Sequence, residues 1–281
     1  MLPPKPAVPP KFAAEAPEAG STPDLSIVVP VYNERDNLEP LLAEIDHALV
    51  GRLYEVLFVD DGSRDGSADT LAELQAARAN VRVLRFPRNQ GQSAAMAAGF
   101  RAARGAVVVT LDADLQNDPA DIPRLLELLE AGEGCDMVSG IRAHRRDGFL
   151  RLAASRIANR ARNWVVGDRV SDVGCSLKAY RRSFLLKLPA FNGLHRFLPA
   201  LLQIQGARIR ELAVNHRPRV HGVSKYSINN RLWRGLHDLV GVRWLQKRWV
   251  DPSLAEEVSW TTPPSGSSSA SPAKPSSPPA S

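Results

Sequence analysis

The stretch Leu25-Ser26-Ile27-Val28-Val29-Pro30-Val31 consists mainly of apolar and β-branched residues. A run of this length and composition is typical of a strand that is buried on both faces. Residues 37–49 follow it with leucine and isoleucine at helical spacing, and residues 54–59 repeat the strand pattern. This order predicts a domain that begins strand, helix, strand, as in proteins with a parallel sheet.

The same alternation continues along the chain. Further strands are predicted at 81–86, 106–111 and 135–139, and further helices at 67–78, at 92–103 and from Asp118 onward. Asp118 suits the N-cap of the last helix, Pro119 its first position and Asp121 its first turn. We therefore expect an α/β fold with a mostly parallel central sheet and helices on both faces. Ligands of such sheets bind at the carboxyl ends of the strands.

The composition is that of a globular protein with an excess of positive charge. Hydrophobic residues make up 44% of the 281 residues and charged residues 23%, which excludes a disordered or collagen-like chain. The two cysteines exclude a disulfide framework and a cysteine-rich zinc site. The formal net charge of +6 favours anionic partners, which include nucleic acid, a membrane surface and phosphorylated ligands.

The two ends of the chain differ in composition from its middle. Residues 1–23 are rich in Pro and Ala, and residues 251–281 are rich in Ser, Pro and Ala, so both are predicted to be disordered tails. The sequence shows neither a signal peptide nor an apolar run of roughly 18 residues that would span a membrane. We expect a folded domain at 24–228 and a separate helix at 229–250.

Polar and acidic residues follow three of the predicted strands. The loops read Tyr-Asn-Glu at 32–34, Asp-Asp-Gly-Ser-Arg-Asp-Gly at 60–66 and Asp-Ala-Asp-Leu-Gln at 112–116. One such loop is ordinary turn chemistry, but three at one edge of a sheet indicate a ligand site. The two carboxylates of the third loop repel each other unless a cation lies between them. Oxygen ligands of this kind suit Mg²⁺ or Mn²⁺, and Gln116 adds a neutral oxygen.

The chain lacks the glycine-rich motifs through which such sheets often bind nucleotides. It has neither Gly-x-Gly-x-x-Gly after the first strand nor Gly-x-x-x-x-Gly-Lys-[Ser/Thr]. A dinucleotide-dependent oxidoreductase and a P-loop nucleotidase therefore lose their main support. Binding of a diphosphate through a bridging metal, without either motif, is what transfer from a nucleotide-sugar requires.

The three loops, in this order and at this spacing, resemble those of the family 2 glycosyltransferases, which have the GT-A nucleotide-diphospho-sugar transferase fold. More narrowly, residues 25–248 resemble the polyprenyl-phosphate glycosyltransferases, the group of dolichyl-phosphate mannose synthase and the bacterial undecaprenyl-phosphate sugar transferases. The resemblance implies that residues 24–228 are a catalytic domain. It implies metal-dependent transfer, with inversion, of a sugar from GDP-mannose or a UDP-sugar to a polyprenyl phosphate.

The resemblance also implies which residues form the donor site and carry the chemistry. Residues implied to bind the nucleoside-diphosphate sugar are Pro30, Tyr32, Glu34, Val59, Asp61, Asp112, Ala113, Lys178, Arg219 and Lys225. The metal, Mg²⁺ or Mn²⁺, is implied to bind Asp112, Asp114 and Gln116. The residues implied as catalytic are Asp114, Asp172 and Arg219, and Asp172 falls at a position often given a catalytic or sugar-positioning role.

Seven arginines between residues 142 and 162 account for much of the positive charge. Nucleic acid is disfavoured as their partner, because the segment lacks interleaved aromatic residues and no nucleic-acid-binding motif accompanies it. Arg151 and Ser155 are expected on one helix face, and an arginine fork suits a phosphate. By the resemblance, Arg142, Arg151 and Ser155 bind the acceptor phosphate. A solvated helix face is the interpretation for most of the other arginines.

Residues 229–250 combine leucines, valines and tryptophans with arginines and lysines. A basic amphipathic helix of this kind can lie in a membrane interface, and the alternative is a helix packed on the core. We expect a cytoplasmic protein attached peripherally to the inner face of the membrane, with a membrane subunit as another means of attachment.

Two other functions stay open from the sequence. A family 2 enzyme can instead act on a glycan or lipopolysaccharide acceptor, although the string nearest to the Gln-x-x-Arg-Trp motif of such enzymes, at 246–249, is one residue too short. A non-catalytic nucleotide-binding membrane adaptor is disfavoured, because such a protein need not keep both the metal-site residues and the basic pair Arg219 and Lys225. The metal-site residues are Asp112, Asp114 and Gln116. The sugar, the nucleotide, the lipid length and the oligomeric state do not follow from the sequence.

Overall fold

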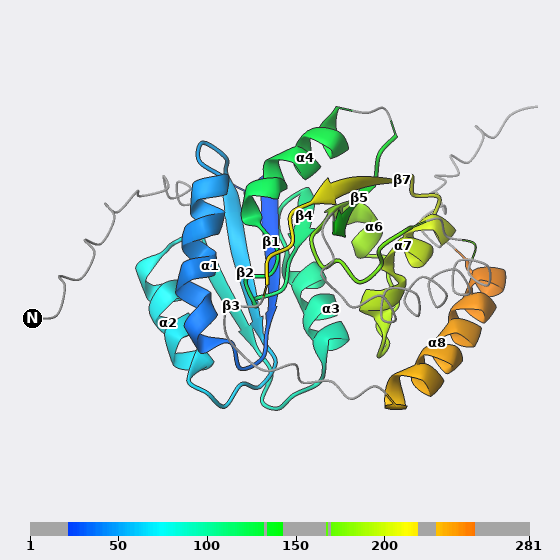
Figure 1. Cartoon of the computed structure of the whole chain (residues 1–281), viewed down its shortest axis with the longest axis horizontal. Helices are drawn as coiled ribbons and strands as arrows, with labels where there is room; N and C mark the ends of the chain where they lie inside the picture. Colours follow the sequence, from blue (N-terminus) through cyan, green and yellow to red (C-terminus); the bar gives the residue numbers. More distant parts are fainter. Residues whose placement is uncertain (1–21, 132–133, 143–166, 168–169, 219–228, 251–281) are drawn as a thin grey trace, which may run out of the picture. The chain divides into compact units, whose positions relative to one another are not determined.

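The computed structural model describes residues 22–131, 134–142, 167, 170–218 and 229–250, the last of these as backbone alone up to residue 236. The described residues form an α/β domain around a sheet of seven strands, which Figure 1 shows nearly edge-on between its helices. The strands in chain order are β1 Leu25–Val31, β2 Tyr54–Asp60, β3 Val81–Arg85, β4 Val107–Thr110, β5 Met137–Arg142, β6 Lys178–Arg181 and β7 Ile209–Val214. Their order across the sheet is β3-β2-β1-β4-β6-β5-β7.

The sheet is mostly parallel, as the sequence predicts. Strands β1 to β4 pair in parallel with one another, and β5 pairs in parallel with β7. Strand β6 runs antiparallel to both of its neighbours, β4 and β5. In the described part of the chain, six strands therefore share one direction, and their carboxyl ends meet at one edge of the sheet.

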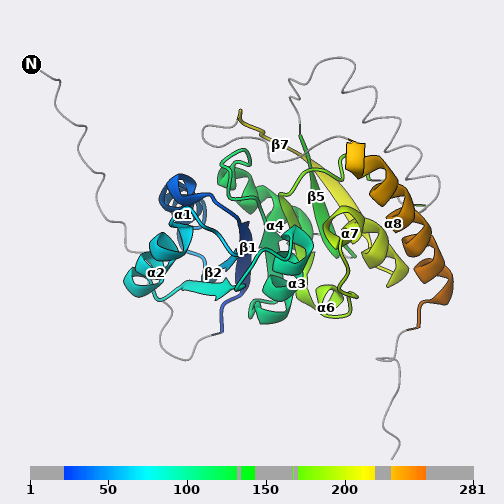
Figure 2. The ribbon, with the colours of Figure 1, turned by 90° about the horizontal axis from the view of Figure 1, so that it is seen from below.

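Helices cover both faces of the sheet, which confirms the second part of the prediction (Figures 1 and 2). The helical elements are α1 Arg35–Ala48, α2 Ser67–Ala77, α3 Gln92–Ala102, the 3₁₀ turn η1 Pro119–Asp121, α4 Ile122–Glu130, α6 Arg182–Leu185, α7 Leu194–Ile204 and α8 Asn229–Arg248. Side chains of α1, α2 and α4 form one hydrophobic core with the sheet. Side chains of α3, α6, α7 and α8 form the second core, on the opposite face.

Strand β1 shows why its sequence is mainly apolar. Ile27 and Val29 belong to the core under α1 and α4, whereas Val28 belongs to the core under α3, and all three are fully buried. A strand covered on both faces has no polar side. Burial of each such side chain contributes roughly 1.5–3 kcal/mol relative to leaving it exposed.

The predicted elements agree with the structure to within a few residues, apart from the strands β6 and β7 and the helices α6 and α7, which the sequence analysis did not identify. Strand β6 has only four residues, too few for a periodic pattern. Asp118 is confirmed as a cap: its side chain accepts a hydrogen bond from the amide of Ala120 at 3.1 Å. It caps the 3₁₀ turn η1, from which α4 continues.

The reversed strand β6 brings Lys178 to the edge where the parallel strands end. Lys178 begins β6 and pairs with Thr110, the last residue of β4, and with Ser139 of β5. Because β6 starts where its neighbours finish, the residues just before it lie beside the loop that follows β4. The segment 170–177 therefore belongs to the same edge as the acidic loops.

Helix α8 occupies residues 229–248 of the segment expected to be helical, and one of its faces packs on the core. Leu239 and Val242 are buried against the core that contains α7. Val240 and Trp244, one helical turn apart, are 66% and 63% exposed. Along the ranges that the structure covers, none of the helices has both the length and the apolar character needed to cross a membrane.

Candidate active site

The loop after β1 is locked to the loop after β2. The amide of Asn33 donates to Ser63 Oγ at 2.9 Å, and the amide of Arg64 donates to Asn33 Oδ1 at 2.8 Å. Asn33 has a φ of +54°, a conformation that asparagine tolerates better than most residues. These bonds hold the loop that carries Tyr32, which is 36% exposed, beside the second acidic loop.

The resemblance implies that Glu34 and Val59 bind the donor, and in the structure Glu34 is hydrogen-bonded to neighbouring helices while Val59 is buried in the core. The Glu34 carboxylate accepts from Asn37 Nδ2 at 2.7 Å, and the Glu34 amide donates to Ser67 Oγ at 3.1 Å. Val59 is fully buried in β2, and its side chain lies in the core under α3. Its side chain is therefore part of the core and not of the exposed loop surface.

Asp61 joins the second-strand loop to the segment before α3. It is 3% exposed, and its two carboxylate oxygens accept from the amides of Gln90 at 2.7 Å and Gly91 at 2.8 Å. Burial raises the pKa of Asp61 above its ordinary value, although the two amides oppose that shift. Gly62 follows with a φ of +72° and lies against the backbone of Arg88, where a larger residue would collide.

The loop after β4 presents the two carboxylates of the predicted metal site. Asp112 Oδ1 accepts from Gln92 Nε2 at 2.9 Å, and Asp114 Oδ1 accepts from the amide of Gln116 at 3.2 Å. Between the two acidic residues, Ala113 is 3% exposed, so the loop contacts the core through its methyl group. The side-chain Nε2 of Gln116 donates to the carbonyl oxygen of Arg217 at 3.4 Å, and this bond orients the Gln116 side chain.

These residues fit a hard divalent cation bound together with a ligand. No group of three or more His, Cys, Asp or Glu side chains suited to a metal occurs among the described residues. Asp112 and Asp114 offer two carboxylates and Gln116 a neutral oxygen. Mg²⁺ and Mn²⁺ typically take few protein oxygens and complete their coordination with water and substrate phosphate. The donor set therefore suits a metal–diphosphate complex better than a closed metal cage.

Arg142, Asp172 and Lys178 form a second cluster at the same edge. Arg142 ends β5, and its Nε and Nη2 donate to the two carboxylate oxygens of Asp172 at 2.7 and 2.8 Å. The Lys178 ammonium donates to the carbonyl oxygens of Val173, at 3.0 Å, and Cys175. Burial lowers the pKa of Lys178, while the charges of Asp172 and Asp112 oppose that shift.

The cluster joins the predicted catalytic residue Asp172 directly to the predicted phosphate ligand Arg142. Lys178, predicted to bind the donor, uses two of its three N–H donors on the main chain of the segment before it. The charge of Asp112 also acts on the pKa of Lys178, so this cluster lies close to the acidic loop. Four further predicted site residues lie outside the described residues: Arg151, Ser155, Arg219 and Lys225.

The structure adds residues that the sequence analysis did not identify. Gln92, at the start of α3, orients Asp112, and the neighbouring Ser93 Oγ lies 2.7 Å from His195 Nδ1 at the start of α7. Arg217 contacts Glu44 at 2.8 Å and Asp118 at 2.6 Å, and its amide donates to Gln116. For Gln92 and Ser93, the signal available in the sequence was the polar stretch Gln-Gly-Gln-Ser at the start of an alanine-rich helix.

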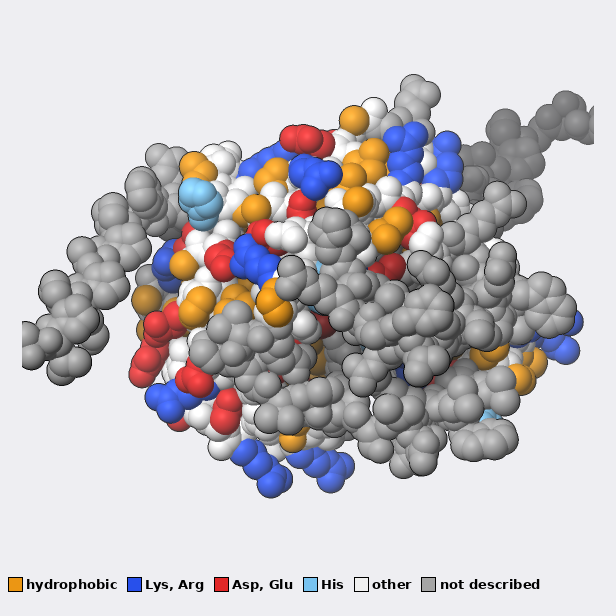
Figure 3. All heavy atoms as spheres, viewed as in Figure 1, with side chains coloured by type: hydrophobic (Ala, Val, Ile, Leu, Met, Phe, Trp, Pro, Cys, Tyr) orange, Lys and Arg blue, Asp and Glu red, His pale blue; other side chains and the backbone are white. Residues whose placement is uncertain are grey.

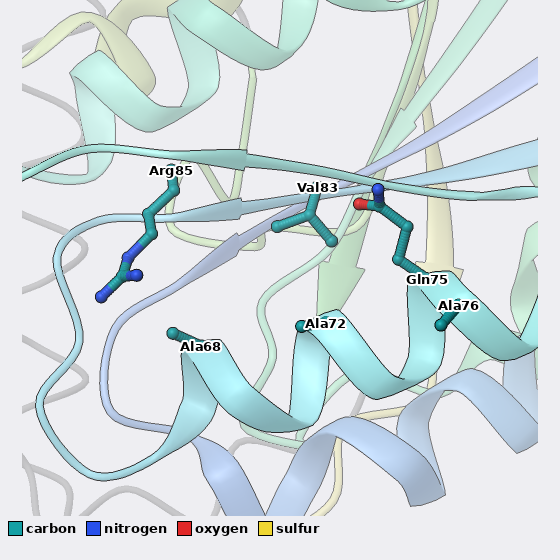
Figure 4. Close-up of a pocket in the computed structure, with 6 residues that line it drawn as sticks. All are labelled: Ala68, Ala72, Gln75, Ala76, Val83 and Arg85. Carbon is teal, nitrogen blue, oxygen red and sulfur yellow. The ribbon is translucent and has the colours of Figure 1, made fainter.

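A groove on the β3 side of the sheet contains none of the predicted site residues. It lies between α2 and β3, the strand at one end of the sheet, and Figure 4 shows Arg85 and Val83 facing the helix across it. The remaining lining residues belong to α2, and they are Ala68, Ala72, Gln75 and Ala76. Small apolar side chains dominate this groove, and its one charged lining residue, Arg85, pairs with Asp60 of β2 at 3.3 Å.

Comparison with known proteins places this geometry in one family. The sequence model of glycosyl transferase family 2 matches residues 26–188. The dodecaprenyl-phosphate galacturonate synthase of Rhizobium johnstonii is 40% identical over 235 residues, which cover 82% of this chain and 69% of that protein. The undecaprenyl-phosphate 4-deoxy-4-formamido-L-arabinose transferase of Klebsiella pneumoniae is 42% identical over 219 residues, which cover 77% and 66%. The chain thus spans about two thirds of the length of these relatives.

Solved structures agree with the fold. The glucosyl-3-phosphoglycerate synthase of Mycobacterium tuberculosis, solved with Mn²⁺, UDP and glucosyl-3-phosphoglycerate, superposes with a TM-score of 0.59 at 20% identity and 82% coverage of each chain. The same synthase, solved with UDP, gives a TM-score of 0.58 at 21% identity, again with 82% coverage of each chain. At these identities the likeness shows a shared fold, the GT-A-like arrangement expected from the sequence.

Proposed function

Because the chain belongs to glycosyl transferase family 2, we propose that it transfers a sugar from a nucleoside-diphosphate sugar to the phosphate of a polyprenyl phosphate. One observation carries the proposal: the acidic loop at Asp112 and Asp114 and the arginine Arg142 lie at one edge of the sheet, around Lys178. Such an arrangement can hold a metal–diphosphate and a second phosphate close together. The names of the relatives, which are polyprenyl-phosphate sugar transferases, support the acceptor.

The proposed reaction is a direct displacement at the anomeric carbon. A phosphate oxygen of the acceptor forms the new bond to carbon as the bond from that carbon to the donor's diphosphate breaks, and the nucleoside diphosphate leaves. The acceptor phosphate has a second pKa near 6, so it is ionised at neutral pH and needs no strong general base. The protein must instead hold two anions together and stabilise the leaving group.

Each set of residues has a part in this scheme. Asp112, Asp114 and Gln116 would hold Mg²⁺ or Mn²⁺, which supplies positive charge to the departing diphosphate. Arg142 binds the acceptor phosphate through guanidinium N–H groups other than the two that donate to Asp172. Residues proposed for the nucleoside are Pro30, Tyr32, Glu34, Val59 and Asp61, and those proposed to complete the diphosphate and acceptor sites are Ala113, Arg151, Ser155, Arg219 and Lys225.

Release of nucleoside diphosphate by the purified chain tests the proposal. The mixture contains undecaprenyl phosphate, Mn²⁺ or Mg²⁺ and, in turn, GDP-mannose or one of a panel of UDP-sugars. Release that requires lipid and metal, and that is lost in Asp114→Asn but kept in the exposed control Asp36→Asn, would support it. Release independent of lipid would favour a glycan acceptor, and binding of nucleotide without release from any donor would favour the non-catalytic adaptor.

We also propose that the exposed face of α8 lies on an anionic membrane surface at the inner face of the membrane. Val240 and Trp244 form an apolar pair on this face, and Arg243, Lys247 and Arg248 beside them are exposed. Figure 3 shows hydrophobic and basic side chains next to one another at the carboxyl end of this helix. Tryptophan favours the headgroup region, and basic side chains favour anionic lipids.

Flotation with vesicles tests this attachment. The chain should float with phosphatidylglycerol vesicles, less with phosphatidylcholine vesicles, and poorly when Val240 and Trp244 are both changed to serine. Val50→Ser removes an exposed valine outside α8 and serves as the control, because Val50 is 76% exposed. If the wild-type chain stays at the bottom of the gradient, or the double variant floats as well as the wild type, the proposal is wrong.

A further inference from the structure

The most tightly defined polar contact at the candidate site is the pair of Arg142 and Asp172. The carboxylate of Asp172 receives both Nε and Nη2 of the guanidinium, and it also accepts from the Arg142 amide at 3.3 Å. The side chains of Arg142 and Asp172 are 16% and 6% exposed, so solvent screens the pair only weakly. A fork held at two nitrogens has a fixed plane and direction.

The main chain that follows Asp172 is held by hydrogen bonds at three of its carbonyl groups. The buried ammonium of Lys178 holds the carbonyl groups of Val173 and Cys175, and Thr110 Oγ1 donates to the carbonyl oxygen of Ser176 at 2.7 Å. Ser176 Oγ, in turn, lies 2.5 Å from Asn117 Oδ1. Ser176 is thus bonded to both ends of the acidic loop: to Thr110, the last residue of β4, and to Asn117, just beyond Gln116.

Gly174 leaves no spare space around the guanidinium. A Cβ at this position would lie 2.9 Å from Arg142 Nη2 and 3.6 Å from Asp172 Oδ1. The pair therefore packs against a bare stretch of backbone. Its geometry is defined by packing on one side and by the carboxylate on the other.

We propose that Asp172 is a positioning residue that aims the guanidinium of Arg142 at the acceptor phosphate, and that it acts on transfer through Arg142. This proposal rests on the proposed function. A guanidinium carries five N–H donors, and the carboxylate accepts from two of them, which fixes the plane in which the group lies. Binding of the phosphate then does not require the arginine to be ordered, which favours affinity. The resemblance by itself implies a catalytic or sugar-positioning role for Asp172, without a role through Arg142.

A double-mutant cycle separates the two roles. Hydrogen bonds to charged groups are worth roughly 1.5–3 kcal/mol, so Asp172→Asn should raise the KM for undecaprenyl phosphate by about 10- to 100-fold, with a small change in kcat. Arg142→Gln should raise it at least as much, and the double variant should be no worse than Arg142→Gln. Fully additive effects, or a loss confined to kcat, would overturn the proposal. Unchanged binding of UDP with Mn²⁺ shows that the variants are folded.

Binding measured without turnover distinguishes this proposal from the proposed function. The Nε–H resonance of Arg142, assigned by its absence in Arg142→Gln, is followed by NMR during titration with dodecyl phosphate. The wild-type resonance should shift on binding, and Asp172→Asn should bind about tenfold or more weakly. Gly174→Ala, which adds one methyl group against the fork, should weaken binding to an intermediate degree.

The outcomes of the two experiments are distinct. If the wild-type chain transfers no sugar to any lipid phosphate but Asp172→Asn still weakens dodecyl phosphate binding, the positioning role stands and the proposed function fails. If the wild-type chain is active and Asp172→Asn binds dodecyl phosphate as well as the wild type does, the positioning role is wrong.

Discussion

Replacing Gly62 by alanine tests how rigidly the second acidic loop is held. Gly62 has a φ of +72°, and a Cβ there would lie 2.6 Å from the carbonyl carbon of Arg88 and 2.7 Å from the amide nitrogen of Asn89. Both neighbours are backbone atoms, so only a movement of the loop relieves the contact. The loop carries Asp61, whose carboxylate bonds to the amides just before α3.

Two costs add in this variant. An L-residue at a left-handed position costs about 1 kcal/mol relative to glycine, and an extra methyl group in a packed site costs about 1–3 kcal/mol. We therefore expect the free energy of unfolding to fall by about 2–4 kcal/mol. For a domain of this size that corresponds to a decrease in Tm of about 4–16 °C.

Gly51 provides a matched control. Its φ is +80°, and no heavy atom lies within 4 Å of the Cβ position, so Gly51→Ala carries the conformational cost alone. Thermal and urea unfolding should place Gly51→Ala about 1 kcal/mol below the wild type and Gly62→Ala clearly lower. Calorimetry with UDP and Mn²⁺ should show weaker binding for Gly62→Ala only. Equal unfolding temperatures for the two variants would refute the reasoning, because they would show that the Arg88 backbone yields without cost.

Asp114→Asn removes one proposed metal ligand. Loss of a residue that only hydrogen-bonds to a metal ligand already costs about 10- to 100-fold in metal affinity, so Mn²⁺-dependent UDP binding should fall by at least that factor. Unchanged binding in calorimetry would contradict the metal assignment. Gln92→Leu removes the hydrogen bond to Asp112 and should weaken the same binding about tenfold, with UDP binding in EDTA unaffected as its control. Burial by itself would raise the pKa of Asp118, but hydrogen bonds from Arg217 and Asn215 outweigh burial and leave that pKa below 3.8. Because the folded value is the lower one, this group contributes stability above pH 3.8 and loses it as the pH falls through the folded pKa. The free energy of unfolding should therefore fall more steeply below about pH 4 in the wild type than in Asp118→Asn, and parallel curves from urea titrations would contradict the assignment.

Local patterns in the sequence were sufficient for most of the fold. The apolar run at β1, the helical spacing of α1 and the cap at Asp118 each express a preference that acts within a few residues. Parallel strands joined by helices place their carboxyl ends at one edge, so the sequence order also located the acidic loops on that edge. The two carboxylates of the Asp112–Gln116 loop were recognisable as a metal site because like charges so close in the chain repel each other unless a cation lies between them.

The reversal of β6 was decided by the tertiary structure. Lys178–Arg181 is too short to show a period, and its place between β4 and β5 depends on pairing with strands that lie far away in the sequence. That placement buries Lys178 and seats Asp172 on Arg142, thirty residues apart in the chain. The contact of Gln92 with Asp112 has the same origin, because it joins the start of a helix to a loop on a different strand.

The sequence by itself determined which chemical groups this protein carries and that the acidic loops lie at the carboxyl edge of the sheet, since local propensity and strand order are contained in short stretches. Only the tertiary structure decided which of those groups touch. Hydrogen bonds and ion pairs between distant segments depend on packing of the whole domain, so the pairing of Arg142 with Asp172 and the burial of Lys178 had no signature in the sequence.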